Sequence, residues 1–210
     1  RDLSRRPRVE LRAPALSALV TYMLDAWPSH AALDPGRVGA FGFSAGGFTV
    51  LVAVGGRPDL SRLAPQCARH PARYDCAVSL AHPGATAASW PPERDGRIRA
   101  AVIAAPGLGY LFDRASLAAV TVPVQLWRAD RDRVVSGPYS VDVVRAALPT
   151  PPEFHPVPGA GHLDFMAPCD AAAVRSRWCT TAPGFDPAAF HRDFDAAILR
   201  FFRTTLAPPA

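Results

Sequence analysis

The apolar positions of the chain form two kinds of segment that alternate along the sequence. Short and almost continuous apolar runs are typical of strands buried on both faces of a parallel sheet, and they cover residues 38–43, 97–107, 120–130 and 152–162. Apolar residues at helical spacing, or in longer buried stretches, predict helices over residues 13–27, 45–56, 136–148 and 186–206. Strands that alternate with helices predict an α/β fold, with a mostly parallel sheet and helices on both faces.

The residues at the ends of these segments agree with this assignment. Pro14 and Pro138 suit the first turn of a helix, Gly55 and Gly56 suit a helix end, and Asp186 is a good N-cap. The sequence contains no internal repeat and no clear linker, so we expect a single domain over residues 1–210. The most irregular segment is 166–185, which we interpret as an insertion within that domain.

Composition excludes some classes of function. No apolar run is long enough to span a membrane, and the charged first residues do not resemble the core of a signal peptide, so we expect a chain that begins after processing or within a longer gene product. The net charge is +5, and all 23 basic residues are arginines scattered along the chain. Scattered arginines without interleaved aromatic residues do not support nucleic-acid binding.

The four cysteines fall into two local pairs, Cys67 with Cys76 and Cys169 with Cys179. Four cysteines allow three connectivities, and we expect the local one, which closes two short loops. Neither pair has the spacing of a metal site, and we expect no metal and no cofactor. Two disulfides would place the protein in an oxidising compartment, periplasmic or secreted, whereas four reduced cysteines in a cytosolic protein remain the alternative.

The segment "GAFGFSAGG", residues 39–47, places Ser44 between a predicted strand and a predicted helix. A nucleophile elbow needs glycine two residues before and two residues after its serine, where a side chain would collide with the turn, and Gly42 and Gly46 meet this need. The helix that begins at Ala45 would direct that residue's N–H toward a developing oxyanion. The alternative is an ordinary serine that caps the helix.

Partners for a nucleophilic serine follow two later strands. Asp130 and Asp132 come after the third predicted strand, and His162 lies in a glycine loop after the fourth. The chain order serine, acid, histidine is that of serine hydrolases built on a parallel sheet. Histidine titrates near neutrality and can take and return the serine proton, while an acid orients its ring.

Other candidate groups have weaker support from their neighbours. Cys67 and Cys169 have no base nearby in the sequence, and loop or surface roles suit His70, His82 and His191 better than catalysis. The segment "PGLG", residues 106–109, does not have the spacing of a dinucleotide-binding loop.

Three segments, "DPGRVGAFGFSAGG", "VPVQLWRADRDRVV" and "GAGHLDF", resemble the dienelactone-hydrolase-like branch of the α/β-hydrolase family, which includes chlorophyllase-like and platelet-activating-factor-acetylhydrolase-like esterases. The resemblance covers residues 8–206. It implies a metal-independent serine hydrolase that cleaves carboxylic esters, with Ser44 as nucleophile and His162 as base. It also favours Asp132 over Asp130, because the family's acid precedes an apolar pair such as Val134-Val135.

The chain departs from this family before the elbow. Family members carry several strands and a loop with a second oxyanion donor upstream, whereas about forty residues with one predicted helix precede Ser44 here. We therefore expect strand 38–43 to be a hydrophobic edge, and an upstream segment or a second chain to complete the sheet. The alternative function is an incomplete, non-catalytic half that works only with such a partner.

The substrate is less closely defined than the reaction. Peptidases and thioesterases use the same machinery, so the leaving group stays open. An apolar pocket for a small ester would be lined by Phe43, Trp127, Leu163 and Phe165, although packing in the core explains each of them equally well.

Overall fold

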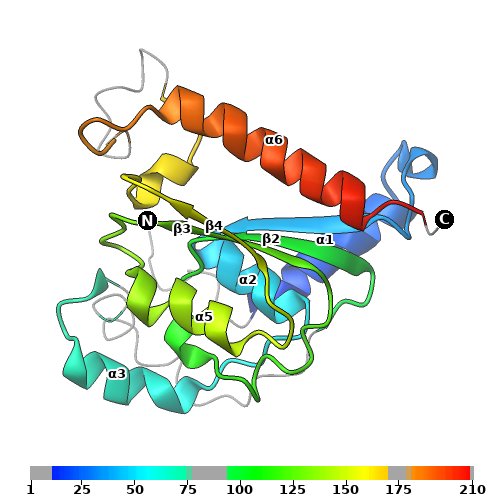
Figure 1. Ribbon diagram of the computed structural model, residues 1–210. Coiled ribbons are helices and arrows are strands. Elements are labelled where there is room, and N and C mark those ends of the chain that lie inside the picture. Colours follow the sequence, from blue (N-terminus) through cyan, green and yellow to red (C-terminus); the bar gives the residue numbers. More distant parts are fainter. Residues whose placement is uncertain (1–10, 75, 77–93, 170–178, 180, 209–210) are drawn as a thin grey trace, which may run out of the picture.

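A four-stranded sheet, in which all strands are parallel, forms the centre of the molecule (Figure 1). The computed structural model describes residues 11–74, 76, 94–169, 179 and 181–208. The strands lie side by side in chain order and are β1 (Val38–Phe43), β2 (Ile98–Ala104), β3 (Val124–Ala129) and β4 (Glu153–Val157). The predicted α/β fold class is therefore confirmed.

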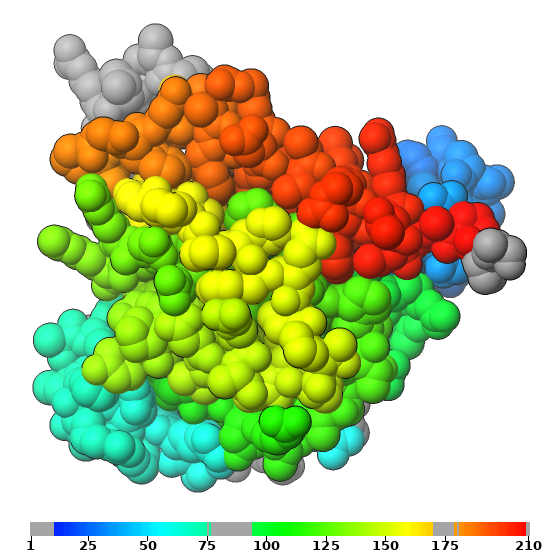
Figure 2. Space-filling view, viewed as in Figure 1, coloured from blue at the N-terminus to red at the C-terminus, as the bar shows by residue number. Residues whose placement is uncertain are grey.

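Helices cover both faces of the sheet, as the alternating pattern predicted. One face carries α1 (Arg12–Asp25), α2 (Ala45–Ala53), α3 (Leu63–Arg69) and α5 (Val141–Ala147). The other face carries α6 (Pro187–Thr205), which runs along the sheet as the orange-to-red helix of Figures 1 and 2. Short 3₁₀ turns connect these elements, namely η3 (His30–Ala32), η4 (Leu60–Arg62), η6 (Gly109–Leu111), η7 (Gly137–Tyr139) and η8 (His162–Phe165).

The core is divided into two layers by the alternation of side chains along the strands. On β2, Ala101 and Ile103 pack toward α2 and α5, whereas Val102 and Ala104 pack toward α6. All four side chains are fully buried. A strand buried on both faces has no polar alternation, which is why the sequence showed β2 as a continuous apolar run.

Several predicted boundaries differ from the observed ones for local reasons. β3 begins at Val124 because Pro123 has no N–H to donate, although its carbonyl accepts a hydrogen bond from Ala101. The predicted helix 136–148 consists of η7 and α5, separated at Ser140. Helix α3 was not predicted, because it is short, contains Pro65 and lies within a longer polar stretch of the sequence.

Both predicted disulfides are present. Cys67 at the end of α3 bonds Cys76, and Cys169 bonds Cys179. The two disulfides indicate an oxidising, extracellular-type environment. Half of the predicted insertion 166–185 lies outside the described residues, namely residues 170–178 and 180. No helix in the described ranges is long and apolar enough to cross a membrane.

Strand β1 is an edge of the sheet. Within the described part of the chain it pairs with β2 on one side and with no strand on the other. Phe41 of this strand is 48% exposed, although its ring lies 6.0 Å from that of Phe194 of α6. Nearby, a groove of about 520 Å³ separates α1 from the end of α6, and its apolar lining includes Met23, Val38, Phe202 and Leu206.

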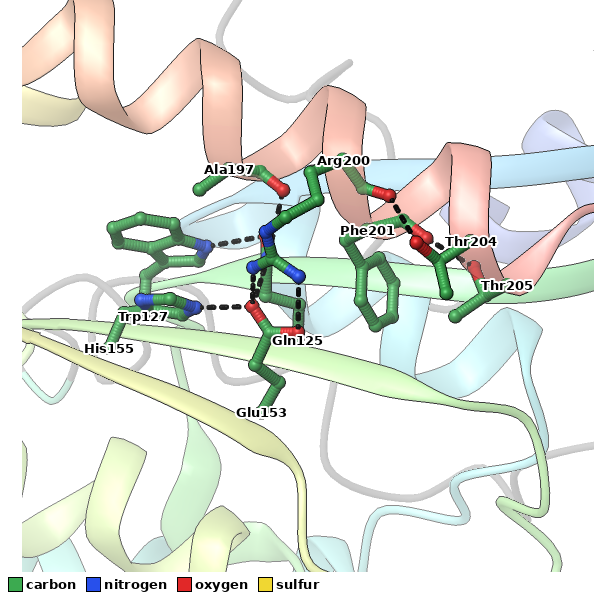
Figure 3. Close-up of polar contacts among 9 residues, drawn as sticks. All are labelled: Gln125, Trp127, Glu153, His155, Ala197, Arg200, Phe201, Thr204 and Thr205. Atoms are coloured by element: carbon green, nitrogen blue, oxygen red, sulfur yellow. Dashed lines mark hydrogen bonds and ion pairs between the residues drawn. The ribbon is translucent and has the colours of Figure 1, made fainter.

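A polar cluster fastens α6 to the sheet (Figure 3). Glu153 of β4 accepts hydrogen bonds from Arg200 of α6, from His155 at 2.6 Å and from Gln125 at 2.8 Å. Burial raises the pKa of the Glu153 carboxyl, but these hydrogen bonds, that of Arg200 above all, outweigh burial and lower the pKa to about 2. Gln125 also donates to the carbonyl of Ala197 at 3.2 Å. Glu153 and Gln125 therefore each form a hydrogen bond with α6.

Candidate active site

Ser44 occupies a strained turn between β1 and α2. Its φ of 54° and ψ of −117° are unfavourable for a residue with a side chain, and such strain is common at functional sites. A Cβ on Gly42 would lie 2.2 Å from the carbonyl oxygen of Gly46, so the turn closes only with glycine at position 42. The Ser44 hydroxyl makes no cap hydrogen bond to α2, which argues against the helix-cap interpretation.

The prediction that Gly46 is needed for steric reasons is wrong. Apart from its chain neighbours and the backbone of its own helix, a Cβ added at Gly46 would meet no atom of the described residues within 4 Å. The two glycines of the motif differ because α2 turns back over Gly42, whereas Gly46 faces open space at the start of that helix.

The loops after β3 and β4 place an acid and a histidine beside Ser44. The Ser44 Oγ lies 2.9 Å from Nε2 of His162, and Nδ1 of His162 lies 2.7 Å from Oδ2 of Asp132. A carboxylate only accepts hydrogen bonds, so the Nδ1–H of His162 donates to Asp132 and Nε2 is left to accept from the Ser44 hydroxyl. The ring is thus held in the tautomer that a general base requires.

The Asp132 carboxylate is itself held in place. Its Oδ1 accepts hydrogen bonds from the N–H groups of Val134 at 2.8 Å and Val135 at 2.7 Å, and its side chain is 1% exposed. Main-chain hydrogen bonds join the two loops, including one of 2.8 Å from Arg131 N–H to the carbonyl of Ala160. The acid and the base therefore share one rigid frame.

Asp130 has different partners. Its carboxylate binds the Arg128 guanidinium at 3.0 Å, and Arg128 also binds Asp142 at 2.9 Å. These hydrogen bonds, the one to Asp142 above all, raise the pKa of Arg128. The geometry thus separates the two aspartates that the sequence left as alternatives, with Asp132 on the histidine and Asp130 in a surface ion pair.

The N–H of Ala45 is available at the first turn of α2. It has no hydrogen-bond partner among the described residues, as is usual for the first N–H groups of a helix. Two main-chain hydrogen bonds hold Ser44 beside it, from Ser44 N–H to Ala104 O at 2.9 Å and from Gly107 N–H to Ser44 O at 3.0 Å. Such an N–H can stabilise negative charge that develops next to Ser44 Oγ.

Sequence reasoning missed the loop that follows β2. Ala105 and Leu108 have positive φ values of 41° and 55°, which is uncommon outside glycine. The side chain of the fully buried Ser140 connects two residues of this loop. Its Oγ donates to Pro106 O at 2.5 Å and accepts from Gly109 N–H at 2.8 Å. Nothing in the local sequence of Ser140 signals this contact across 31 or more residues.

Three of the four predicted pocket residues belong to one aromatic cluster, in which the ring of Phe43 lies 5.8 Å from that of Phe165 and packs on the layer that contains Trp127. Phe43 is half-buried and its ring lies 4.7 Å from that of His162, while Leu163 is half-buried next to His162 in the chain. Phe165 is buried in the core layer under α6. Trp127 is also buried there, stacked on His155 at 4.1 Å, and its Nε1–H donates to Gln125 at 2.9 Å. For Trp127 and Phe165, core packing is therefore the better interpretation.

The remaining candidates are accounted for by other contacts. Cys67 and Cys169 are in disulfides and are not thiol nucleophiles. The His70 ring lies 4.7 Å from that of Tyr139, and His191 Nε2 lies 2.9 Å from the carbonyl of Asp164. His82 lies outside the described residues. The part of the chain that the structure describes contains no group of three or more side chains suited to hold a metal ion.

Comparisons with known proteins assign no family to this chain. No protein-family model matches the chain, and no curated protein matches its sequence significantly.

Proposed function

We propose that the protein is a serine hydrolase that cleaves carboxylic esters through an acyl-enzyme intermediate. One observation carries the proposal: on a strained turn, the Ser44 hydroxyl is joined by hydrogen bonds of 2.9 and 2.7 Å to His162 and then to a buried Asp132. Nucleophile, base and orienting acid are the parts that acyl transfer needs, and here they stand at the carboxyl ends of three parallel strands.

In the acylation step, Ser44 Oγ attacks the ester carbonyl carbon while His162 Nε2 takes the hydroxyl proton. The carbonyl π electrons move to its oxygen, and the Ala45 N–H donates a hydrogen bond to the resulting oxyanion. Asp132 stabilises the imidazolium that has formed. When the tetrahedral intermediate collapses, the bond to the alcohol oxygen breaks and His162 returns its proton to that oxygen.

In the deacylation step, the same groups act on water. His162 Nε2 takes a proton from the water as its oxygen attacks the acyl carbon. The second tetrahedral intermediate collapses, the bond to Ser44 Oγ breaks, and His162 gives the proton back to Oγ. The carboxylic acid leaves and the resting hydrogen-bond chain is restored.

The ester specificity is proposed from the resemblance of three segments to dienelactone-hydrolase-like esterases. Ser44, Asp132 and His162 lie in those three segments, one in each. Thioesters and peptides are cleaved by the same steps, and the leaving group would be decided by a panel of substrates. With the two disulfides, we further propose that the enzyme works in the periplasm or after secretion.

The proposal is tested by covalent labelling and by turnover. A fluorophosphonate probe should label the protein at Ser44, and p-nitrophenyl esters should be hydrolysed. Ser44→Ala should abolish labelling, and Ser44→Ala and His162→Ala should each lower turnover about a thousandfold or more. Unchanged turnover by a folded Ser44→Ala protein would contradict the mechanism.

A second proposal concerns completeness of the site. No strand of the described residues pairs with the outer edge of β1, and Phe41 on this strand is 48% exposed. Both observations favour a partner segment, upstream in the same polypeptide or from a second chain, that pairs with this edge. It would also supply a second oxyanion donor, and loss of one such donor costs about 2.7–4 kcal/mol in the transition state. Full activity of these 210 residues alone, as a soluble monomer, would contradict this proposal.

A further inference from the structure

The loop that carries His162 is held from a distant part of the chain. His191, near the start of α6, places its Nε2 2.9 Å from the main-chain carbonyl oxygen of Asp164. A carbonyl only accepts hydrogen bonds, so Nε2 of His191 carries the hydrogen and donates it. This hydrogen bond joins α6 to η8 at Asp164, which follows His162 by two residues. Asp164 and His191 are 27 residues apart in the chain.

The side chain of Asp164 also binds the main chain on the N-terminal side of His162. Its Oδ2 accepts a hydrogen bond of 2.7 Å from the N–H of Gly161, and the residue is only 4% exposed. The main chain of Asp164 is thus bound to α6, while its side chain is bound to the residue that precedes His162. His162 is enclosed between the two contacts.

The loop needs such a restraint because its own sequence is permissive. It begins with Pro158-Gly159-Ala160-Gly161, and Gly159 has a φ of +78°. Glycine imposes little backbone preference, so external contacts must fix the position of the His162 ring. A displacement of about 1 Å in a catalytic group can cost about a hundredfold in rate.

The His191 ring is itself oriented by aromatic packing. Its centroid lies 5.2 Å from that of Phe190 and 5.9 Å from that of Phe194, with the rings nearly perpendicular. Phe190 and Phe194 each lie 5.6 Å from Phe165, the last residue of η8. The same face of α6 therefore packs against η8 and aims the His191 hydrogen bond at it.

We propose that His191 is a positioning residue for His162, acting through Asp164 to hold the imidazole between Ser44 and Asp132. The inference rests on the proposed function. It assigns to α6, which contributes no group to the reaction, control over the geometry of the general base.

The test compares two substitutions of similar volume. His191→Leu removes the donor, whereas His191→Gln places an amide N–H near the original Nε2. His191→Leu should lower kcat for a p-nitrophenyl ester about 10–100-fold with KM changed less than about threefold, and His191→Gln should restore most of the rate. His30→Leu, at an exposed position in η3, controls for loss of a histidine elsewhere.

A second measurement does not depend on turnover. The Nδ1–H proton of His162, hydrogen-bonded to Asp132, should give a far-downfield proton NMR resonance that His162→Ala removes. His191→Leu should weaken or shift this resonance, and His191→Gln should preserve it. If the wild-type protein neither labels nor turns over, the proposed function fails, while the resonance still decides whether His191 positions the ring.

Two results would overturn the inference. One is a His191→Leu protein with the rate and the resonance of the wild type. The other is an equal loss of kcat and thermal stability in both substitutions, because that pattern shows a packing role in which the hydrogen-bond donor has no part.

Discussion

Gly42 and Gly46 stand at equal distances from Ser44 in the chain but have different surroundings. We predict that Gly42→Ala prevents the elbow from closing, because its Cβ would lie 2.2 Å from a main-chain oxygen. The protein should lose several kcal/mol of stability or fail to fold. Gly46→Ala should leave the melting temperature unchanged or raise it, since its Cβ meets open space and alanine favours the helix. Thermal unfolding measures both, and equal melting temperatures for the two variants would contradict the prediction.

The two neighbouring aspartates give a second prediction at this scale. Asp132→Asn should lower kcat by about four orders of magnitude, because an amide in place of the carboxylate no longer fixes the required tautomer of His162. Asp130→Asn should have a mild effect, since it loses only a surface ion pair with Arg128. Steady-state turnover of both variants decides the matter, and a reversed order would overturn the assignment of the acid.

At the residue scale, the sequence indicated side chains that the structure brings together where a short segment constrains its own backbone. Ser44 and His162 each lie in a glycine-containing motif whose backbone demands are visible in the letters. The contacts of Ser140 and His191 could not be predicted, because each joins residues 27 or more positions apart through a single side chain. Trp127 was placed in a pocket because an aromatic residue near a catalytic loop fits a pocket and a core equally well.

At the scale of elements, an ionised Glu153 adds a polar contact to the apolar packing that attaches α6 to the sheet. The pKa of this carboxyl is about 2 in the folded protein, below its ordinary value of 4.5. The resulting stabilisation is therefore present above about pH 4.5 and is lost as the pH falls toward 2.

We predict that Glu153→Gln destabilises the protein by about 1–2 kcal/mol at neutral pH, a value that allows for solvent screening of a partly exposed carboxylate. The difference from the wild type should shrink between pH 4.5 and 2. Denaturant unfolding across this range measures it. Asp195→Asn, on the exposed side of α6, is the control, and a pH-independent difference for Glu153→Gln would contradict the prediction.

The bounds of an element were predicted well where a regular pattern of apolar residues extends over many positions. α6 was predicted to within one residue at each end, because its amphipathic pattern is regular and Asp186 caps it, accepting from Ala189 N–H at 3.0 Å. The segment of α3 was missed because its stability comes from outside the helix. It has only seven residues, and the disulfide from Cys67 to Cys76 ties its last turn to a later part of the chain.

At the scale of the whole molecule, the open edge of β1 predicts self-association. Phe41 is 48% exposed on a strand whose outer edge pairs with no strand of the described residues, and such an edge promotes pairing between sheets of different molecules. We predict that Phe41→Lys reduces aggregation at high concentration, as measured by light scattering. Leu199→Lys removes an apolar side chain that is 53% exposed on α6, away from the edge, and should help less. An equal effect of both would show that general surface polarity is responsible.

The packing of Trp127 against Phe194 of α6 makes the seam between the sheet and α6 optically accessible. The indole is stacked on the His155 ring, with an angle of 12° between their planes, and its centroid lies 4.7 Å from that of Phe194. The share of the intrinsic fluorescence that disappears in Trp127→Phe therefore comes from this seam. The same signal would reveal α6 lifting from the sheet while β1 to β4 stay paired, so loosening of this one helix could be followed in the intact protein without any attached dye.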